Sequence, residues 1–362
     1  MLETARRYRK STTAGAAVLA AVLVVGLLAA RGRSAPALPR VSAKSLLASA
    51  IRAVSRNGPV SGTATVHLDL GLPQIPSTGE GPGTGPLATL SELSGDHTLR
   101  VWRSRAGVRI AEILPAAERA VFATRRSLWL WDSTDLTATH VLPRSTNAMA
   151  EPGAQPAGRL DPEAMAAKAL RAITPSTKVT VGAPIRVARR AAYPLFLHPR
   201  TSKTLVGTVE IDLDGSTRLP LRVAITPRGG SHPAISDGFD SVSFVSIDPS
   251  MFSFTPPPGS KVKTKQAPSL GTERAAPGAR SGYPAPPAVR TFGRGWATIV
   301  AVRMPSLSEI AAKHQTLKEL VRLLPYSGPL LSVRLADGVD HSWVVAGLVP
   351  QSALAAVASR LP

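Results

Sequence analysis

The sequence predicts an α+β protein, with an N-terminal transmembrane helix, a curved antiparallel β-sheet capped by helices, and a small C-terminal α/β module. The chain has 362 residues, 44% of them apolar, with 29 glycines and 33 prolines, and its length suits one large or two modest domains. Short segments that alternate apolar and polar residues between Pro/Gly turns predict the sheet. An uncharged N-terminal run predicts the transmembrane helix, and a Pro/Gly/basic stretch marks off the C-terminal module.

The N-terminal run is the first element. Residues 14–30 carry no charge, and Thr12 and Thr13 extend the run to residues 12–30, about 28 Å of helix. Four basic residues precede it and two follow closely, which favours a cytoplasmic N-terminus and an extracytoplasmic body. We therefore expect residues 1–40 to form a basic flank and a single-pass anchor in the cell membrane. The alternative is signal cleavage at Ala35-Pro36-Ala37, which would secrete the body.

The net charge of +20 is concentrated in two places. Residues 1–40 carry seven basic residues and one acidic residue, and residues 261–294 carry the same numbers. No basic helix, zinc finger or basic-aromatic strand motif accompanies this charge, so we do not predict nucleic-acid binding. A positive surface near an anionic bilayer fits the pattern better. The absence of cysteine excludes disulfides, thiolate nucleophiles and cysteine metal sites.

Residues 41–260 are predicted to form the main domain. Ser42 is a candidate N-cap for a helix with Leu47, Ala50, Ile51 and Val54 on one face. A second short helix is expected over residues 162–173. Strands are expected over residues 63–70, 97–104, 108–114, 120–124, 127–131, 137–142, 178–187, 193–198, 205–213, 219–226, 239–245 and 251–254. The regular spacing of the strands between residues 63 and 142 indicates an antiparallel meander.

One of these strands is apolar on both sides. Leu128 and Leu130 point to one face, whereas Trp129 and Trp131 point to the other. Either helices and loops cover both faces, or one face lines an apolar cavity that holds a ligand. The sequence leaves both interpretations open.

The C-terminal part is separated by a Pro/Gly/basic stretch over residues 261–290, which we expect to be a disordered linker. Residues 291–362 are predicted to form a small α+β module. Its expected elements are strands over 296–304, 330–335 and 341–349 and helices over 306–324 and 351–361.

Three phrases link residues 41–260 to a known family. They are Trp131-Asp132 after an apolar strand, the Asp214–Val223 hairpin ending in LPLRV, and the F-x-F-x-P-P-x-G pattern at residues 252–259. With the order of elements, they resemble the actinobacterial LolA-like outer-membrane-lipoprotein-sorting (carrier) proteins. The resemblance implies an open, curved half-barrel whose concave apolar face accommodates acyl chains. Trp102, Phe122, Trp129 and Trp131 would then line the lipid-binding groove.

The last phrase of the chain, HSWVVAGLVPQSALAAVASRL, resembles the end of the MucB/RseB envelope-stress regulators. Two functional hypotheses follow. The first is a membrane-tethered extracytoplasmic protein that binds an acyl lipid or lipoprotein, with a carrier role. The alternative is an envelope-stress sensor or scaffold that binds a membrane regulatory protein.

Enzymatic motifs are not found. The sequence contains no G-x-S-x-G, no H-E-x-x-H and no G-x-x-x-x-G-K-[ST] pattern. Its seven histidines are dispersed, and none is paired at metal-ligand spacing. We therefore predict no catalytic residue, no metal site and no cofactor.

Overall fold

The computed structural model describes residues 37–56, 58–69, 71, 94–125, 127–142, 175–266, 289–305, 324–337 and 341–361. The predicted membrane segment at 12–30 and the predicted helix at 162–173 lie outside these residues, as does the helix expected over 306–324 except for its last residue. Within the described ranges, no helix is both long and apolar enough to cross a membrane.

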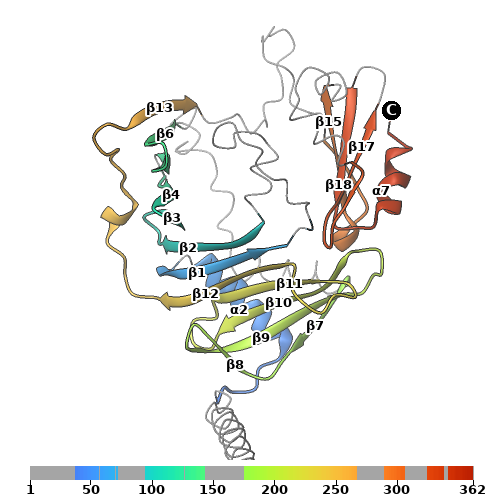
Figure 1. Cartoon of the computed structure of the whole chain (residues 1–362). Coiled ribbons are helices and arrows are strands. Elements are labelled where there is room, and N and C mark those ends of the chain that lie inside the picture. Colours follow the sequence, from blue (N-terminus) through green and yellow to red (C-terminus); the bar gives the residue numbers. More distant parts are fainter. Residues whose placement is uncertain are drawn as a thin grey trace, which may run out of the picture.

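A large curved sheet dominates the molecule (Figure 1). Among the described residues it contains 13 strands in the order β13-β6-β5-β4-β3-β2-β1-β12-β11-β10-β9-β7, with β8 beside β9. Its first half is a meander of β1 (Val60–Leu68), β2 (Gly95–Arg103), β3 (Val108–Leu114), β4 (Ala117–Ala123), β5 (Leu128–Asp132) and β6 (Thr137–Leu142). Its second half comprises β7 (Thr177–Val181), β8 (Ile185–Val187), β9 (Arg190–Pro199), β10 (Val206–Asp214), β11 (Pro220–Pro227) and β12 (Ile235–Ser243). The antiparallel pairing of β1 with β12 joins the two halves.

Most predicted strands are confirmed, and two are corrected. The strand expected over 178–187 is divided into β7 and β8, because Pro184 between them has no N–H to donate to a ladder. The strand expected over 251–254 is absent, and a 3-10 turn, η2 (Pro249–Phe252), stands there instead. Asp248 caps this turn by accepting a hydrogen bond from the Ser250 N–H at 2.9 Å. Phe252 at its end is buried.

The disordered linker expected over residues 261–290 is wrong at its start. Lys261–Gln266 form strand β13, which pairs in parallel with β6 at the end of the sheet. The preceding segment carries the chain from β12 along the outside of β2–β6 and so brings β13 back beside β6 (Figure 1). Residues 267–288 lie outside the described residues.

Helix α2 (Ala43–Ser55) confirms the predicted cap, since the Ser42 side chain accepts a hydrogen bond from the Ser45 N–H at 3.2 Å. Its apolar face buries Leu46, Leu47 and Ala50 against the second half of the large sheet. Their sheet partners include Leu195 and Leu213. The helix thus covers one face of the sheet at this end.

The C-terminal module is a second, five-stranded sheet in the order β14-β15-β18-β17-β16 among the described residues. Its elements are β14 (Val289–Phe292), the 3-10 turn η3 (Gly295–Ala297), β15 (Ile299–Pro305), β16 (Tyr326–Ser327), β17 (Ser332–Asp337), β18 (His341–Gly347) and helix α7 (Gln351–Ala358). Its core contains Trp343, Val345 and Leu354, which joins α7 to the sheet.

The two sheets are packed together. Leu330 is only 2% exposed because it inserts among Leu197, Val206 and Val209 of the large sheet. The Leu348 carbonyl accepts hydrogen bonds from the Thr204 hydroxyl at 2.7 Å and the Leu205 N–H at 2.8 Å. The C-terminal module is therefore fixed to the β9–β10 end of the large sheet.

Candidate functional site

Strand register shows which side chains share a face of the large sheet. Leu195 of β9 packs against α2. The residue paired with it on the next strand, and then the residue paired with that one on each following strand, are in turn Ile211, Val223, Asp237, Val66 and His97. Because directly paired residues point to the same face, all of these lie on the face that α2 covers. We call this the inner face and the opposite one the outer face.

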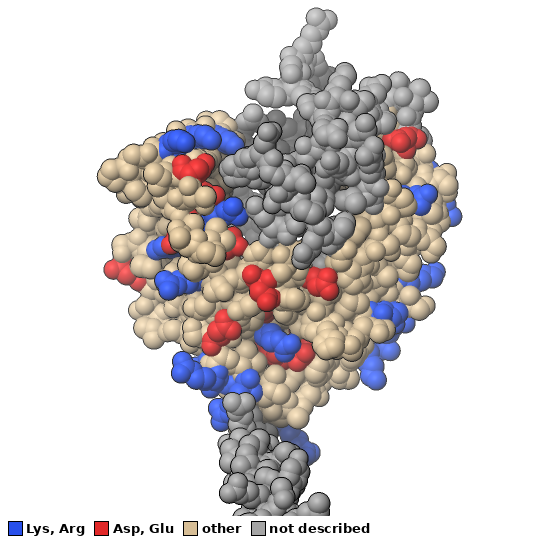
Figure 2. Space-filling view, in the orientation of Figure 1, with Lys and Arg blue, Asp and Glu red and all other residues tan. Residues whose placement is uncertain are grey.

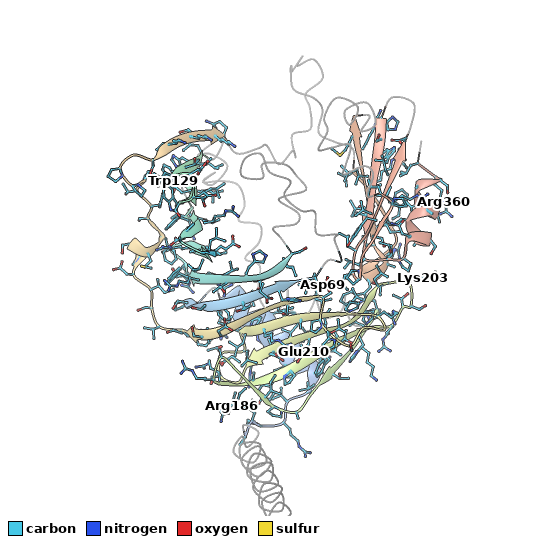
Figure 3. The ribbon with its side chains drawn as sticks, viewed as in Figure 1. Asp69, Trp129, Arg186, Lys203, Glu210 and Arg360 are labelled. Carbon is cyan, nitrogen blue, oxygen red and sulfur yellow. The ribbon has the colours of Figure 1, made fainter. Side chains whose placement is uncertain are left out.

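The four aromatic residues predicted to line a lipid groove do come together, but on the outer face. Trp102, Phe122, Trp129 and Trp131 alternate with inner-face residues on β2, β4 and β5, the strands that form the arm labelled by Trp129 in Figure 3. Phe254, from the segment between β12 and β13, covers them. Its ring centroid lies 4.7 Å from that of Phe122, 5.5 Å from Trp129 and 5.6 Å from Trp131.

Further contacts complete this aromatic cluster. The Trp129 ring stacks on His140 with centroids 4.1 Å apart, and the Arg109 guanidinium lies 4.7 Å from the Phe122 ring centroid. These contacts make the cluster a packed layer between the sheet and the Phe254 segment. The cluster is therefore a partly buried layer in which Phe122 is 5% exposed, and Trp131 also borders the hollow described below. That the four aromatic residues bind lipid stays a prediction.

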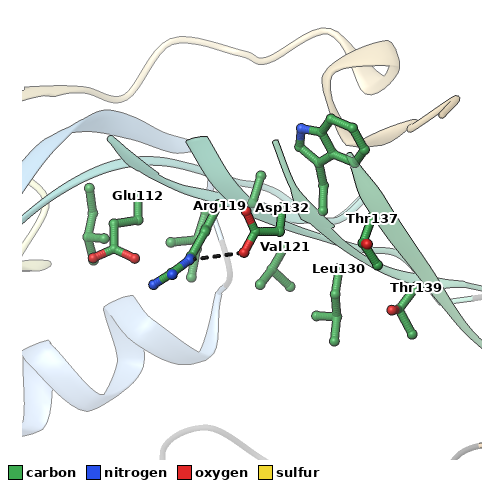
Figure 4. A pocket seen from close by; sticks show the side chains of 11 residues that line it. Glu112, Arg119, Val121, Leu130, Asp132, Thr137 and Thr139 are labelled. Carbon is green, nitrogen blue, oxygen red and sulfur yellow. Dashed lines mark hydrogen bonds and ion pairs between the residues drawn. The ribbon is translucent and has the colours of Figure 1, made fainter. Parts of the chain in front are cut away.

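A hollow lies on the inner face of the same strands (Figure 4). It has a volume of about 420 Å³. Its apolar floor takes one aliphatic side chain from each of β2–β5, namely Leu99, Ile110, Val121 and Leu130. Ile110 is 36% exposed and Leu130 41% exposed, so this floor is open. Thr137 and Thr139 of β6 continue the lining toward the edge of the sheet.

An ion pair borders the hollow. Arg119 Nε donates to Asp132 Oδ2 at 3.1 Å across the β4–β5 pairing, as the dashed line in Figure 4 shows. Burial by itself would raise the pKa of Asp132, but hydrogen bonds from Thr134 and Arg119 outweigh burial and lower that pKa. Asp132 is thus ionised at neutral pH, and its charge is balanced by Arg119.

A second polar pair borders the opposite side. His97 Nδ1 lies 2.7 Å from Glu112 Oε1, and both side chains are about one-fifth exposed, at 19% and 22%. His97 Nε2 is buried and has no hydrogen-bond partner among the described residues. Farther along the inner face, Asp237 stands between Val66 and Val223, and burial raises its pKa.

Sequence reasoning missed the four aliphatic residues of the hollow. The sequence does show that both faces of β5 are apolar, because Leu128 and Leu130 alternate with Trp129 and Trp131. Phe254 determines which face of β5 is covered, because it packs on the face that carries Trp129 and Trp131. It lies 122 residues after Asp132, the last residue of β5. That position depends on the path between β12 and β13, which local patterns do not encode.

Across the described ranges, no group of three or more His, Asp or Glu residues is arranged to hold a metal ion.

Comparison with known proteins finds matches among solved structures at low identity. No protein-family model matches the chain, and no curated protein matches its sequence. A complex of MucA and MucB from Pseudomonas aeruginosa aligns over 87% of this chain and 96% of that chain, at 16% identity and a TM-score of 0.49. A putative outer membrane lipoprotein-sorting protein domain from Vibrio parahaemolyticus aligns over 58% of this chain and 97% of that one, at 11% identity and a TM-score of 0.23.

A LolA superfamily protein from Nitrosomonas europaea aligns over 59% of this chain and 99% of that chain, at 12% identity and a TM-score of 0.21. The solved structures to which this chain is similar include MucB and a LolA superfamily protein.

Proposed function

We propose that this chain is an extracytoplasmic binding protein that holds the acyl chain of a lipid or lipoprotein in the hollow on the inner face of β2–β6. The observation that carries the proposal is the open aliphatic floor of Leu99, Ile110, Val121 and Leu130. Adjacent apolar side chains that remain exposed to water commonly mark a binding surface. The volume of about 420 Å³ lies in the range of small-molecule sites.

The polar surroundings suit binding better than catalysis. Arg119 and Asp132 neutralise each other, and Glu112 is occupied by His97, so no nucleophile with an adjacent base faces the hollow within the described part of the chain. These groups can orient the polar end of a ligand while the aliphatic floor contacts its chain.

Mass spectrometry of organic extracts tests this proposal. The purified protein should retain an acyl lipid, and a Leu130→Asp variant purified in parallel should retain much less of it. Lipid that binds elsewhere on the chain would appear equally in both extracts. Equal amounts from the two proteins, or no acyl lipid from either, would exclude the hollow as an acyl site.

We also propose that residues 12–30 anchor the protein in the cell membrane, with the N-terminus in the cytoplasm. The support is the uncharged run and its basic flank. A reporter active only outside the cytoplasm, fused after Pro362, should be active, and the fusion should stay in the membrane pellet after alkaline washing. An inactive fusion would contradict the orientation, and release into the soluble fraction would indicate cleavage near Ala37.

A second candidate function is an envelope-stress sensor or scaffold that binds a membrane regulatory protein. It is favoured by the firm attachment of the C-terminal module through Leu330 and the Leu348 carbonyl, because a ligand signal can pass between modules only if they are coupled. MucB, to which the chain is similar, has been solved in complex with MucA.

The two functions differ in how lipid affects the partner. A carrier should release its lipid when it meets the partner, whereas a sensor or scaffold should bind a membrane regulator whether or not lipid is present. Site-specific photo-crosslinking of lipid-loaded and lipid-depleted protein in its own membrane distinguishes these outcomes.

A further inference from the structure

Strand β13 places three lysines on the inner face beside the hollow. Its parallel register pairs Lys261 with Thr137, Lys263 with Thr139 and Lys265 with Val141. Thr137 and Thr139 line the hollow. Because residues that are paired in register point to the same face, the three lysines continue the inner face past β6. We call them the lysine row.

The spacing brings the row within reach of a ligand in the hollow. Neighbouring strands lie about 4.8 Å apart, and alternate residues on one strand lie about 6.6 Å apart. All six residues of β13 are exposed. Figure 2 shows basic side chains gathered along the edge that carries β13. None of the ion pairs among the described residues involves the lysine row.

The charges on the two sides of the hollow differ. On the β2–β5 side, Glu112 is paired with His97 and Asp132 with Arg119. On the β13 side, the positive charge of the lysine row is not balanced by such pairs in the described residues. An aliphatic floor next to an unbalanced cationic edge is complementary to a molecule with an apolar chain and an anionic end.

We propose that the lysine row binds the anionic head group of an acyl lipid whose chain occupies the hollow. This inference rests on the proposed function and adds the charge class and the orientation of the ligand. The head group lies over Lys261, Lys263 and Lys265, and the chain extends across β5 and β4 toward Leu99.

Edge protection is the competing explanation, because lysines on an edge strand discourage pairing with other chains. That role needs charge on the strand but no particular face. The observed register puts all three lysines on the inner face and leaves Val262, Thr264 and Gln266 on the outer face. If edge protection is their only role, their removal should promote self-association and leave ligand selectivity unchanged.

The experiment compares two fluorescent lysolipids that have the same acyl chain but different head groups, phosphoglycerol (anionic) and phosphocholine (zwitterionic). The full chain is held in a non-ionic amphipol. The test variant is Lys261→Gln/Lys263→Gln/Lys265→Gln. The matched control is Lys178→Gln/Arg186→Gln/Lys203→Gln, which removes the same charge from exposed residues away from β13, two of them labelled in Figure 3.

We expect the wild type and the control variant to prefer the phosphoglycerol lipid. The test variant should bind that lipid about tenfold more weakly, because it loses three exposed charge pairs with the head group, and should bind the phosphocholine lipid unchanged. The preference should also decline with added salt.

The failures are distinguishable. If the wild type binds both lipids equally, or if the control variant loses as much affinity as the test variant, the lysine row is not a head-group site and the acyl hollow still stands. If the wild type binds neither lipid, the proposed function itself fails. Size-exclusion chromatography of the test variant reports self-association separately.

Discussion

At the scale of residues, neighbours on one strand have opposite roles. Leu130 is 41% exposed in the hollow, whereas Trp131 packs against Phe254 on the outer face. The pleat of β5 alone separates a candidate ligand contact from a core residue. Mutations at adjacent positions should therefore affect different properties.

Trp131→Asp should lower stability. The new carboxylate would lie among Phe122, Trp129 and Phe254 without a partner, so we expect a loss of about 2–4 kcal/mol in the free energy of unfolding. Urea unfolding followed by circular dichroism measures this loss. A variant as stable as the wild type would show that the aromatic cluster is not packed as described.

Asp212 gives a pH-dependent prediction. It is fully buried on β10, and burial together with repulsion from Glu210 outweighs the attraction of Arg222 and raises its pKa to about 7. Its Oδ1 has no hydrogen-bond partner within the described residues. In the unfolded chain the same group titrates near its ordinary value of about 3.9.

Between about pH 4 and pH 7, Asp212 therefore keeps its proton in the folded state but has lost it in the unfolded state. The wild type should lose stability as pH rises through this window, because the ionised form is disfavoured in the fold. Asp212→Asn, which cannot ionise, should be about 1–3 kcal/mol more stable than the wild type at pH 8 and nearly equal to it at pH 4. Thermal unfolding at both pH values checks this, and a constant difference would contradict it.

Local chemistry was predicted from sequence where it depends on near neighbours. The turn of the predicted Asp214–Val223 hairpin is an example, because Asp214 Oδ1 accepts hydrogen bonds from the Ser216 N–H at 3.0 Å and the Thr217 N–H at 2.7 Å. Which face of β5 is covered does not follow from near neighbours, because it depends on Phe254 arriving from a distant segment.

At the scale of elements, too, features that depend on local residues can be predicted from the sequence, whereas features that depend on distant segments cannot. The antiparallel hairpins and the cap of α2 follow from alternation, turn residues and Ser42, all of which are local signals. Strand β13 could not be predicted in this way. The segment Lys261–Gln266 has no apolar face that would predict a strand. It forms a strand only because the chain returns to β6 and pairs with it.

The turn between β2 and β3 offers a test of element packing. A Cβ added to Gly107 would lie 2.7 Å from the Ala123 carbonyl oxygen and 2.9 Å from Phe252 Cβ, beneath η2. Gly107→Ala should therefore displace η2 and cost about 1–3 kcal/mol of stability. Gly58→Ala is the matched control, because a Cβ there meets nothing within 4 Å. Differential scanning calorimetry should show a lower melting temperature for Gly107→Ala only; equal melting temperatures would contradict the packing of η2.

At the scale of the whole molecule, the two sheets form one body despite the Pro/Gly/basic stretch between them. The sequence predicted two modules, and the structure adds the contact of Leu330 with the large sheet. The contact is made by the buried Leu330, by two hydrogen bonds to the Leu348 carbonyl, and by Trp296, whose Nε1 donates to Thr177 Oγ1 at 2.8 Å. It gives no sequence signature, because both sides of the contact look like ordinary core.

Limited proteolysis tests this coupling. Cleavage at Arg274 or Arg280, within the Pro/Gly-rich stretch, should give two fragments that still co-elute in size-exclusion chromatography. Leu330→Asp should make them elute separately, because it places a charge at a site that is 2% exposed. Leu348→Asp, at a side chain that is 39% exposed, should leave them together. Separation of the wild-type fragments would show that the modules are independent.

The central claim is that the inner face of β2–β6 binds an acyl chain, and a matched pair of substitutions tests it most directly. Leu130 on the inner face is 41% exposed, and Ile113 on the outer face of the same arm is 39% exposed. Titration of a fluorescent acyl probe should show several-fold weaker binding for Leu130→Asp and unchanged binding for Ile113→Asp, with both proteins folded, since each new carboxylate can reach water. Equal affinities for the two variants, whether both retained or both lost, would contradict the assignment of the hollow.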